Sequence, residues 1–298
     1  MRDFDYAAPK TLADALDLMA SANGSAKALA GGTDLIDHVR TGRLSPDLLV
    51  DLKKLPELNV LQADSGGLRV GAAVPCWRII GNADIVRDYT ALVDSCQIIG
   101  GIQIQNRASI GGNLCNSGPA ADSIPSIIAL GGQCVIAGKN GTRQIPAEAF
   151  CTGPGRNDLQ PGELLVELKF PAPPAHSGSH YRRFIPRNEM DIAVVGVGAT
   201  VTLDPSGQTF TAARIALGAV GPTPLLAADA ALSLIGKAVS DESIAEAAVA
   251  AKAIATPISD MRGTAEFRTH LVGVLLERVL KAAVARARGE TISYRPGH

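Results

Sequence analysis

Two glycine pairs mark places where the chain could bind an anion. The first pair, Gly31 and Gly32, follows a short apolar stretch and precedes Thr33 and Asp34. Paired glycines let a ligand approach the main chain, and successive N–H groups before a helix favour an anion such as a pyrophosphate. Thr33 and Asp34 could contact that ligand or simply cap the helix. Glycine pairs also form ordinary tight turns, so this motif alone leaves both readings open.

The second pair, Gly111 and Gly112, lies in a glycine-rich segment, 100–125, that also carries many polar side chains. A stretch of this length without a regular pattern is usually functional or disordered, and its apolar content favours a function. The alternative is an ordered loop whose Asn and Ser side chains satisfy nearby main-chain groups. The residues alone do not decide between these two interpretations.

A third cluster contains Arg183, Arg187 and Asp191 just before an apolar stretch. Charge clusters of this kind are usually solvated and contribute little energy, so our default interpretation is a surface cluster. Gly196 and Gly198 begin like a dinucleotide-binding GxGxxG motif, but the third glycine is missing and the segment has a strand pattern. The histidines show no ligand spacing, and no Ser/His/Asp set can be assembled, so we predict no catalytic residue and no metal ligand.

The composition is that of an ordinary globular protein with room for one large domain or two medium ones. Of 298 residues, 46% are hydrophobic and 19% are charged, and the formal net charge is -1. This excludes the basic surface that nucleic acids attract, and no apolar run is long enough to span a bilayer. The five cysteines include no CxxC pair, which argues against zinc or iron–sulfur sites in this chain and predicts reduced thiols in the cytoplasm.

Apolar spacing predicts three regions. The first alternates helix and strand, with Thr11 as a helix cap, at 11–20, 27–30, 35–40 and 48–52. The second contains an Asn140-Gly141 hairpin and strands at 68–72, 133–137 and 164–170. A Pro-rich linker, 171–178, precedes strands at 192–203 and 213–220 and helices at 225–235, 241–255 and 264–288. We therefore place a domain boundary near Pro174.

Taken in order, these segments resemble the FAD-binding subunit, or the equivalent domain, of xanthine dehydrogenases and carbon monoxide dehydrogenases. The start at 4–9 is similar to the start of that family, 30–34 to its first FAD loop and 103–113 to its second. Asp122 matches an acid associated with FAD, and 191–193 matches an Asp-Ile-Ala segment. The chain departs from the family at Gln105, where Arg is usual, and at Arg183, where Lys is usual. The second change keeps the charge but alters its geometry.

The resemblance implies an α+β fold. Two subdomains, about 1–55 and 56–174, would form a FAD-binding domain of the vanillyl-alcohol-oxidase/PCMH type. A C-terminal domain, 179–298, would add a small antiparallel sheet and a helical bundle. Neither departure removes a glycine, so we expect FAD binding to survive.

The resemblance also implies a set of FAD contacts. The N–H groups of Gly31, Gly32 and Thr33 and of 111–113 would hold the pyrophosphate, Ser109 and Asp122 would bond the ribityl or phosphate region, and Arg183 and Asp191 would lie near the flavin ring. The full set of expected cofactor-binding residues is Leu29, Ala30, Gly31, Gly32, Thr33, Asp34, Leu35, Ala108, Ser109, Gly111, Gly112, Asn113, Cys115, Asp122, Ile124, Arg183 and Asp191.

The implied function is electron transfer within a larger dehydrogenase. A large partner subunit would carry the molybdopterin cofactor, a small one the 2Fe–2S clusters, and the three chains would form a heterotrimer that is often doubled. The FAD of this chain would pass electrons to a terminal acceptor. Two alternatives remain: a stand-alone flavin-dependent oxidoreductase of the same fold class, and a flavin-free regulatory or scaffold module.

Overall fold

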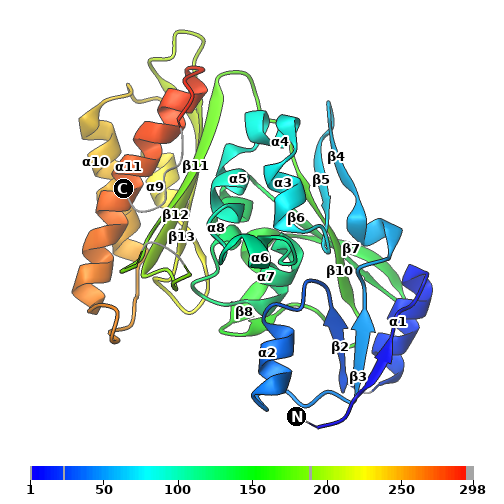
Figure 1. Cartoon of the computed structure of the whole chain (residues 1–298). Helices are drawn as coiled ribbons and strands as arrows, with labels where there is room; N and C mark the ends of the chain where they lie inside the picture. The colour runs from blue at the N-terminus through cyan, green and yellow to red at the C-terminus, as the bar shows by residue number, and fades with distance from the viewer. Residues whose placement is uncertain (1, 23, 188–189, 293–298) are drawn as a thin grey trace.

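The computed structural model describes residues 2–22, 24–187 and 190–292 of the chain. Within them, three larger sheets carry the helices: a parallel sheet near the N-terminus, a five-stranded antiparallel sheet and a four-stranded antiparallel sheet. These three units follow one another across the molecule (Figure 1). The structure is therefore of the predicted α+β class. None of the helices in these ranges is long and apolar enough to cross a membrane.

The N-terminal unit is a parallel sheet with two helices, in the predicted alternation. Its strands lie in the order β1 (Asp5–Ala7), β3 (Leu48–Asp51) and β2 (Ala26–Leu29). Helix α1 (Leu12–Ser21) begins at the predicted cap, where Thr11 Oγ1 accepts from Asp14 N at 3.1 Å. Because neighbouring strands are parallel, their carboxyl ends share one edge, and the turn 30–34 leaves β2 there. This turn leads directly into α2 (Leu35–Arg40).

The middle unit is built on an antiparallel sheet. Its strands lie in the order β4 (Leu61–Asp64), β5 (Gly67–Gly71), β10 (Leu164–Phe170), β6 (Gln133–Gly138) and β7 (Gly141–Pro146). The predicted hairpin joins β6 to β7, and Gly141 has a φ of 115°, which favours glycine. Smaller elements are η1 (Pro56–Asn59), η2 (Ala147–Ala149), β8 (Cys151–Gly153) and β9 (Arg156–Asn157).

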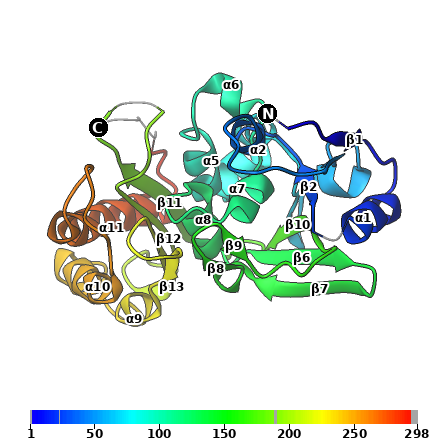
Figure 2. The same ribbon diagram turned by 90° about the horizontal axis from the view of Figure 1, so that it is seen from below.

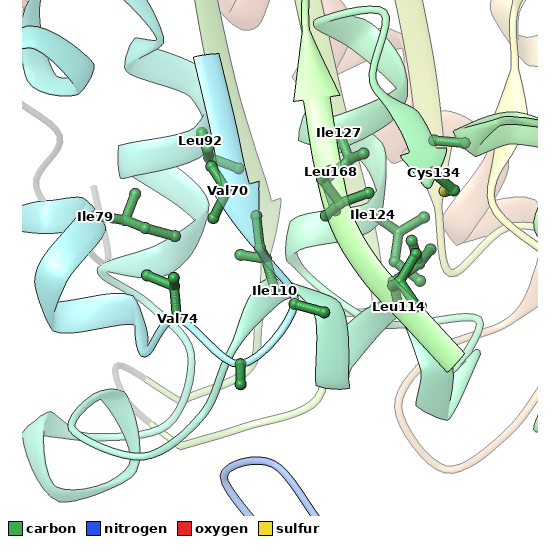
Figure 3. Close-up of a cluster of buried hydrophobic side chains, with 14 of the residues drawn as sticks. Val70, Val74, Ile79, Leu92, Ile110, Leu114, Ile124, Ile127, Cys134 and Leu168 are labelled. Atoms are coloured by element: carbon green, nitrogen blue, oxygen red, sulfur yellow. The ribbon is translucent and has the colours of Figure 1, made fainter. Parts of the chain in front are cut away.

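Short helices lie between the middle sheet and the C-terminal sheet (Figures 1 and 2). They are α3 (Cys76–Ile80), α4 (Ala83–Asp88), α5 (Thr90–Cys96), α6 (Ile102–Gln105), α7 (Ile110–Asn116) and α8 (Ser123–Ala129). The segment 100–125 is thus mostly helical, which corrects the prediction of a stretch with little regular structure. Figure 3 shows the reason: Ile110 and Leu114, one helical turn apart, are buried with Leu168 of β10. The intervening glycines concealed that spacing.

The C-terminal unit is an antiparallel sheet covered on one face by helices (Figure 2). Its strands are β11 (Ser177–Phe184), β12 (Val195–Leu203), β13 (Phe210–Gly218) and β14 (Leu225–Leu226), and its helices are α9 (Ala228–Leu232), α10 (Asp241–Ile254) and α11 (Ala265–Ala287). Two predictions are corrected. Strand β11 begins inside the expected linker, and the expected helix 225–235 starts with β14, because these residues pair with β12 and β13.

Helix α8 connects the middle unit to the C-terminal sheet. All of its residues are buried, and it begins directly after Asp122. A Cβ built on Gly198 of β12 would lie 2.8 Å from Pro125 O, and one on Gly218 of β13 would lie 2.9 Å from Pro125 Cγ. Glycine at both sheet positions therefore allows the first turn of α8 to press against the strands. The position of the C-terminal sheet thus determines the position of the segment around Asp122.

Candidate functional site

The two predicted glycine loops lie against each other. A Cβ built on Gly31 would lie 2.1 Å from the main-chain oxygen of Arg107, so no other residue fits at position 31 without displacing the second loop. The side chains reinforce this contact: Arg107 Nε donates to Gly31 O at 3.5 Å, and Asn116 Nδ2 donates to Asp34 Oδ2 at 3.4 Å. The fold therefore brings together the two halves of the site that the sequence predicts.

The turn 30–34 presents main-chain donors that the protein itself does not use. In the described part of the chain, the N–H groups of Gly31, Gly32 and Thr33 have no acceptor. Gly32 has a φ of 77°, a left-handed conformation that glycine adopts readily. Asp34 stands at the N-cap of α2 without making a capping bond there. Successive free N–H groups in such a turn form a concave site for an anion.

The second loop uses its donors differently from our prediction. Ser109 caps α7: its Oγ accepts from Gly112 N at 3.0 Å, and its main-chain oxygen accepts from Asn113 N at 2.9 Å. Two of the three N–H groups expected to hold a pyrophosphate are therefore engaged inside the helix cap. The Ser109 hydroxyl hydrogen and the N–H of Gly111 remain as donors on this side.

Gly111 and Gly112 have different structural roles. A Cβ on Gly111 would lie 2.5 Å from Ala72 O and 2.6 Å from Ala72 Cα, so this glycine permits close packing of α7 against the segment after β5. Within the described ranges, a Cβ on Gly112 would approach only Ser109 Oγ, at 3.1 Å. Gly112 is thus the glycine of the pair that faces open space, as expected for a position beside a ligand.

Cys115 lies at the end of α7 and contributes no reactive group. Burial raises the pKa of its thiol to about 12, and the neighbouring Cys151 acts in the same direction. The thiol is therefore protonated at neutral pH and offers a ligand an uncharged surface. On the same helix, Asn113 Oδ1 accepts from Ser123 Oγ at 2.6 Å, which ties α7 to α8.

Asp122 is buried and is held from β11 of the C-terminal sheet. Tyr181 Oη donates to its Oδ1 at 2.9 Å, and Arg183 Nη1 donates to its Oδ2 at 2.5 Å. Burial raises the pKa of Asp122 to about 6, although Arg183 and Tyr181 both oppose the rise. The carboxylate thus joins the segment between the second glycine loop and α8 to the C-terminal unit.

Arg183 is part of a buried ion pair, so the default interpretation of a surface cluster is wrong for this residue. Its side chain is 5% exposed. Among the described residues, its guanidinium forms a hydrogen bond with Asp122 alone. A guanidinium has five N–H donors in a planar fork, so most of its donors remain available to a ligand. A buried cation with unused donors is a further feature of a site for an electron-rich group.

Asp191 lies apart from Arg183 at the start of the segment leading into β12. Its Oδ1 accepts from Ile192 N at 2.8 Å, and its Oδ2 lies 3.4 Å from Arg187 Nε. The Ile192 N–H lowers the pKa of Asp191, with a smaller contribution from Arg187. Residues 188–189, between Arg187 and Asp191, lie outside the described residues. No hydrogen bond links Asp191 to the Asp122 cluster within those residues.

The remaining predicted contacts differ in exposure. Ala30, Thr33 and Leu35 are half-buried, whereas Leu29, Ala108 and Ser109 are almost fully buried. Ile124 has no exposed surface and packs in the core beside Ile127 (Figure 3). Ile124 therefore supports the loop from behind, and its expected contact with the cofactor stays a prediction.

Sequence reasoning missed Tyr181. This residue belongs to the site because it stands two positions before Arg183 on a strand and so points to the same face. The alternation would have revealed Tyr181 had β11 been predicted. Gln105, which replaces the usual Arg, donates from Nε2 to Gln97 O at 2.8 Å and so has a structural contact of its own.

The arrangement fits an extended anionic cofactor such as FAD. It offers free N–H groups at 31–33, an open glycine at Gly112, and a buried guanidinium at Arg183. The donors at 31–33 suit a pyrophosphate, and the Arg183 guanidinium suits the hydrogen-bond acceptors of a ring system. No group of His, Cys, Asp or Glu residues in the described ranges could hold a metal ion.

Comparisons with known proteins agree with this geometry. Residues 2–173 match the family model of the FAD-binding domain in molybdopterin dehydrogenase, and 180–283 match that of the CO dehydrogenase flavoprotein C-terminal domain. The chain is 32% identical to the carbon monoxide dehydrogenase medium chain of Hydrogenophaga pseudoflava over 95% of this chain and 98% of that one. It is 33% identical to the putative xanthine dehydrogenase FAD-binding subunit of Escherichia coli (strain K12), over 96% and 99%.

Solved structures show the same relationship. The structure of carbon monoxide dehydrogenase from Hydrogenophaga pseudoflava that lacks the Mo-pyranopterin moiety superposes with a TM-score of 0.91 at 32% identity, covering 96% of this chain and 98% of that one. The match covers both the FAD-binding part and the C-terminal part. The chain therefore belongs to the family of FAD-binding subunits of molybdenum-containing dehydrogenases, and is an oxidoreductase subunit.

Proposed function

We propose that this chain receives electrons from 2Fe–2S clusters of a small partner subunit and passes them through its FAD to a terminal acceptor. A large partner subunit with the molybdopterin cofactor would oxidise the substrate. Bound FAD supplies the redox chemistry, because a flavin can exchange one or two electrons. The observation that carries the proposal is the contact between Gly31 and Arg107, which joins two loops whose free donors suit one extended cofactor.

Each proposed contact has a physical role. The N–H groups of 31–33 and the Ser109 hydroxyl bind the pyrophosphate, and Gly112 leaves room for it. Asp122 stands where it can accept from a ribityl hydroxyl. Arg183 presents its unused donors to the flavin ring, and Asp191 lies toward the acceptor side. Ala30, Leu35 and Cys115 supply an uncharged wall.

The partner subunits and the assembly form part of the same proposal. The names of relatives support it, since several of them are called medium chains or FAD-binding subunits. We propose a heterotrimer of this chain with a molybdenum subunit and an iron–sulfur subunit, which could pair with a second copy. The five cysteines are free, which supports work in a reducing compartment such as the cytoplasm. The division into 1–174 and 179–298 is likewise proposed.

The first test is the visible absorbance spectrum of the purified chain, followed by identification of the flavin released on denaturation. We expect one FAD per chain and no iron–sulfur bands. Gly112→Leu should lose the flavin because the side chain would occupy the cofactor's space. Gly81→Leu is the matched control, since Gly81 is exposed and has an ordinary φ of -86°. A fully flavinated Gly112→Leu protein would refute the placement of the pyrophosphate.

A second measurement tests the electron path. The chain alone, loaded with FAD, should not oxidise substrates of molybdenum dehydrogenases. When the two partner subunits are added, the substrate should reduce the flavin. This reduction is measured as bleaching at the flavin absorbance maximum. Substrate turnover by the isolated chain would instead favour a stand-alone flavoenzyme.

A further inference from the structure

Strand β11 turns one polar face toward the helices of the middle unit. Alternate side chains of a strand point the same way, and here they are Ser179, Tyr181 and Arg183. Ser179 Oγ accepts from Ala91 N at 3.1 Å, while Tyr181 and Arg183 both reach Asp122. A buried strand with a polar inner face specifies the geometry of its contacts, because each unsatisfied group would be costly.

Tyr181 is confined on several sides. The residue is 1% exposed, and its hydroxyl donates its hydrogen to Asp122. A Cβ on Gly196 of the neighbouring strand would lie 2.6 Å from Tyr181 Oη, which means that the phenol occupies the space that a side chain at 196 would need. The main-chain N of Tyr181 donates to Asp94 Oδ2 at 3.2 Å. Both the backbone and the ring are therefore fixed.

The fixed phenol determines how Asp122 presents its two oxygens. One oxygen accepts from Tyr181 and the other from Arg183. Without the hydroxyl, the carboxylate would be held from one side only and could rotate about its side-chain bond. Such a rotation would carry the Arg183 guanidinium with it and redirect the donors that Asp122 leaves unused.

We propose that Tyr181 is a positioning residue of the flavin site, whose hydroxyl fixes Asp122 and thereby aims the free donors of Arg183 at the flavin. This rests on the proposed FAD-binding function and adds a residue to it. The ordinary alternative is that Tyr181 only fills the core between β11 and β12. The two roles differ in one respect: core filling affects folding stability, whereas positioning also affects the bound flavin.

The chain offers a matched control in Tyr89, which is also buried, at 3% exposed, and whose hydroxyl donates to Pro171 O at 3.1 Å. Tyr181→Phe and Tyr89→Phe each remove one buried hydroxyl bond. Both should lower the melting temperature by a similar amount. FAD affinity of the full chain, measured by quenching of flavin fluorescence, should fall about fivefold in Tyr181→Phe and by less than about twofold in Tyr89→Phe. The flavin midpoint potential should shift only in Tyr181→Phe.

Two further variants make the test decisive. Gly196→Ala keeps the hydroxyl but displaces it, and should change FAD affinity and potential in the same direction as Tyr181→Phe. Tyr181→Phe combined with Asp122→Asn should weaken FAD binding no more than Asp122→Asn alone, because both act through one carboxylate. If the wild-type chain binds FAD and the two tyrosine variants have equal FAD affinity and equal flavin potential, the positioning role of Tyr181 is overturned. The proposed FAD-binding function would then still stand. A wild-type chain that takes up no FAD would overturn the proposed function together with this inference.

Discussion

Two buried carboxylates stand where the middle helices meet the C-terminal unit, and they are compensated to very different degrees. Asp94 belongs to α5 and Asp122 precedes α8, and β11 contacts both. Each has an arginine partner from the C-terminal unit. A buried charge is stable only when its partners replace the lost water.

Asp94 is fully compensated. Arg286 of α11 binds it through two bonds, Nη1 to Oδ2 at 2.5 Å and Nη2 to Oδ1 at 2.9 Å. His180 Nδ1 lies 2.7 Å from Oδ2, and the N–H of Tyr181 adds another donor. Burial alone would raise the pKa of Asp94, but His180 and Arg286 together hold it below its ordinary value. This site is complete without any ligand.

Asp122 is compensated less. It has one guanidinium bond and one phenol bond, and burial raises its pKa to about 6. Among the residues that the structure describes, its partner Arg183 uses only one guanidinium donor, toward Asp122. We infer that the Asp94 cluster joins the two units, whereas the Asp122 cluster is left incomplete for the cofactor. Four measurements test this contrast.

The largest effect is expected from breaking the Asp94 cluster. Arg286→Leu leaves a buried carboxylate without its bidentate partner, so the free energy of unfolding should fall by about 3–5 kcal/mol, measured by urea denaturation. Arg87→Leu is the control, because Arg87 has a 66% exposed side chain in its surface pairs with Asp84 and Asp88. That control should lower the free energy of unfolding far less, because water and salt screen exposed pairs. If both variants lose the same free energy of unfolding, the buried Asp94–Arg286 pair stabilises the fold no more than the surface pairs of Arg87.

Neutralising each carboxylate compares the two sites directly. Asp94→Asn should lower the free energy of unfolding of the FAD-free chain by about 2 kcal/mol more than Asp122→Asn, because it deprives Arg286 of a well-paired anion. FAD affinity should respond in the opposite order, with the larger loss in Asp122→Asn. Urea denaturation and flavin titration of both variants check the pair. The contrast is wrong if Asp122→Asn proves the more destabilising change.

The pH dependence should also have opposite signs. The pKa of Asp122 is raised to about 6 in the folded chain, so its contribution to stability is present at low pH and is lost as the pH rises from about 4 to about 6. The pKa of Asp94 is lowered, so its contribution is lost as the pH falls. Relative to Asp122→Asn, the FAD-free wild type should therefore lose stability as the pH rises through this window. A difference that does not change with pH would contradict the raised pKa.

The smallest effect is expected from Arg183→Lys. Lysine keeps the positive charge and the pairing with Asp122 but loses the planar fork of donors. FAD affinity should fall only about two- to fivefold, and the flavin potential should move by less than in Arg183→Leu. Redox titration of the two variants separates charge from geometry. An equal response to both substitutions would show that geometry, not charge, carries the effect.

Local sequence patterns predicted much of the fold. Thr11 as a cap and Asn140-Gly141 as a hairpin are confirmed, because each depends on residues within a few positions of itself. The two glycine loops predicted the family, because each motif is a short run of neighbouring residues. The helices within 100–125 were missed, because Gly111 and Gly112 weaken the local helical signal while burial of Ile110 and Leu114 supplies the stability.

The sequence by itself determined the family and the cofactor, and it predicted the two glycine loops as the place where that cofactor binds. Only the tertiary structure decided which residues hold those loops in place. Asp94 meets Arg286 across 192 positions and Tyr181 meets Asp122 across 59, and no local period records either contact. Likewise, the need for glycine at position 198 is visible only in the folded chain, where Pro125 packs against it. The physical reason is that burial and charge compensation depend on what the finished fold places side by side, whereas caps and turns depend on neighbours along the chain.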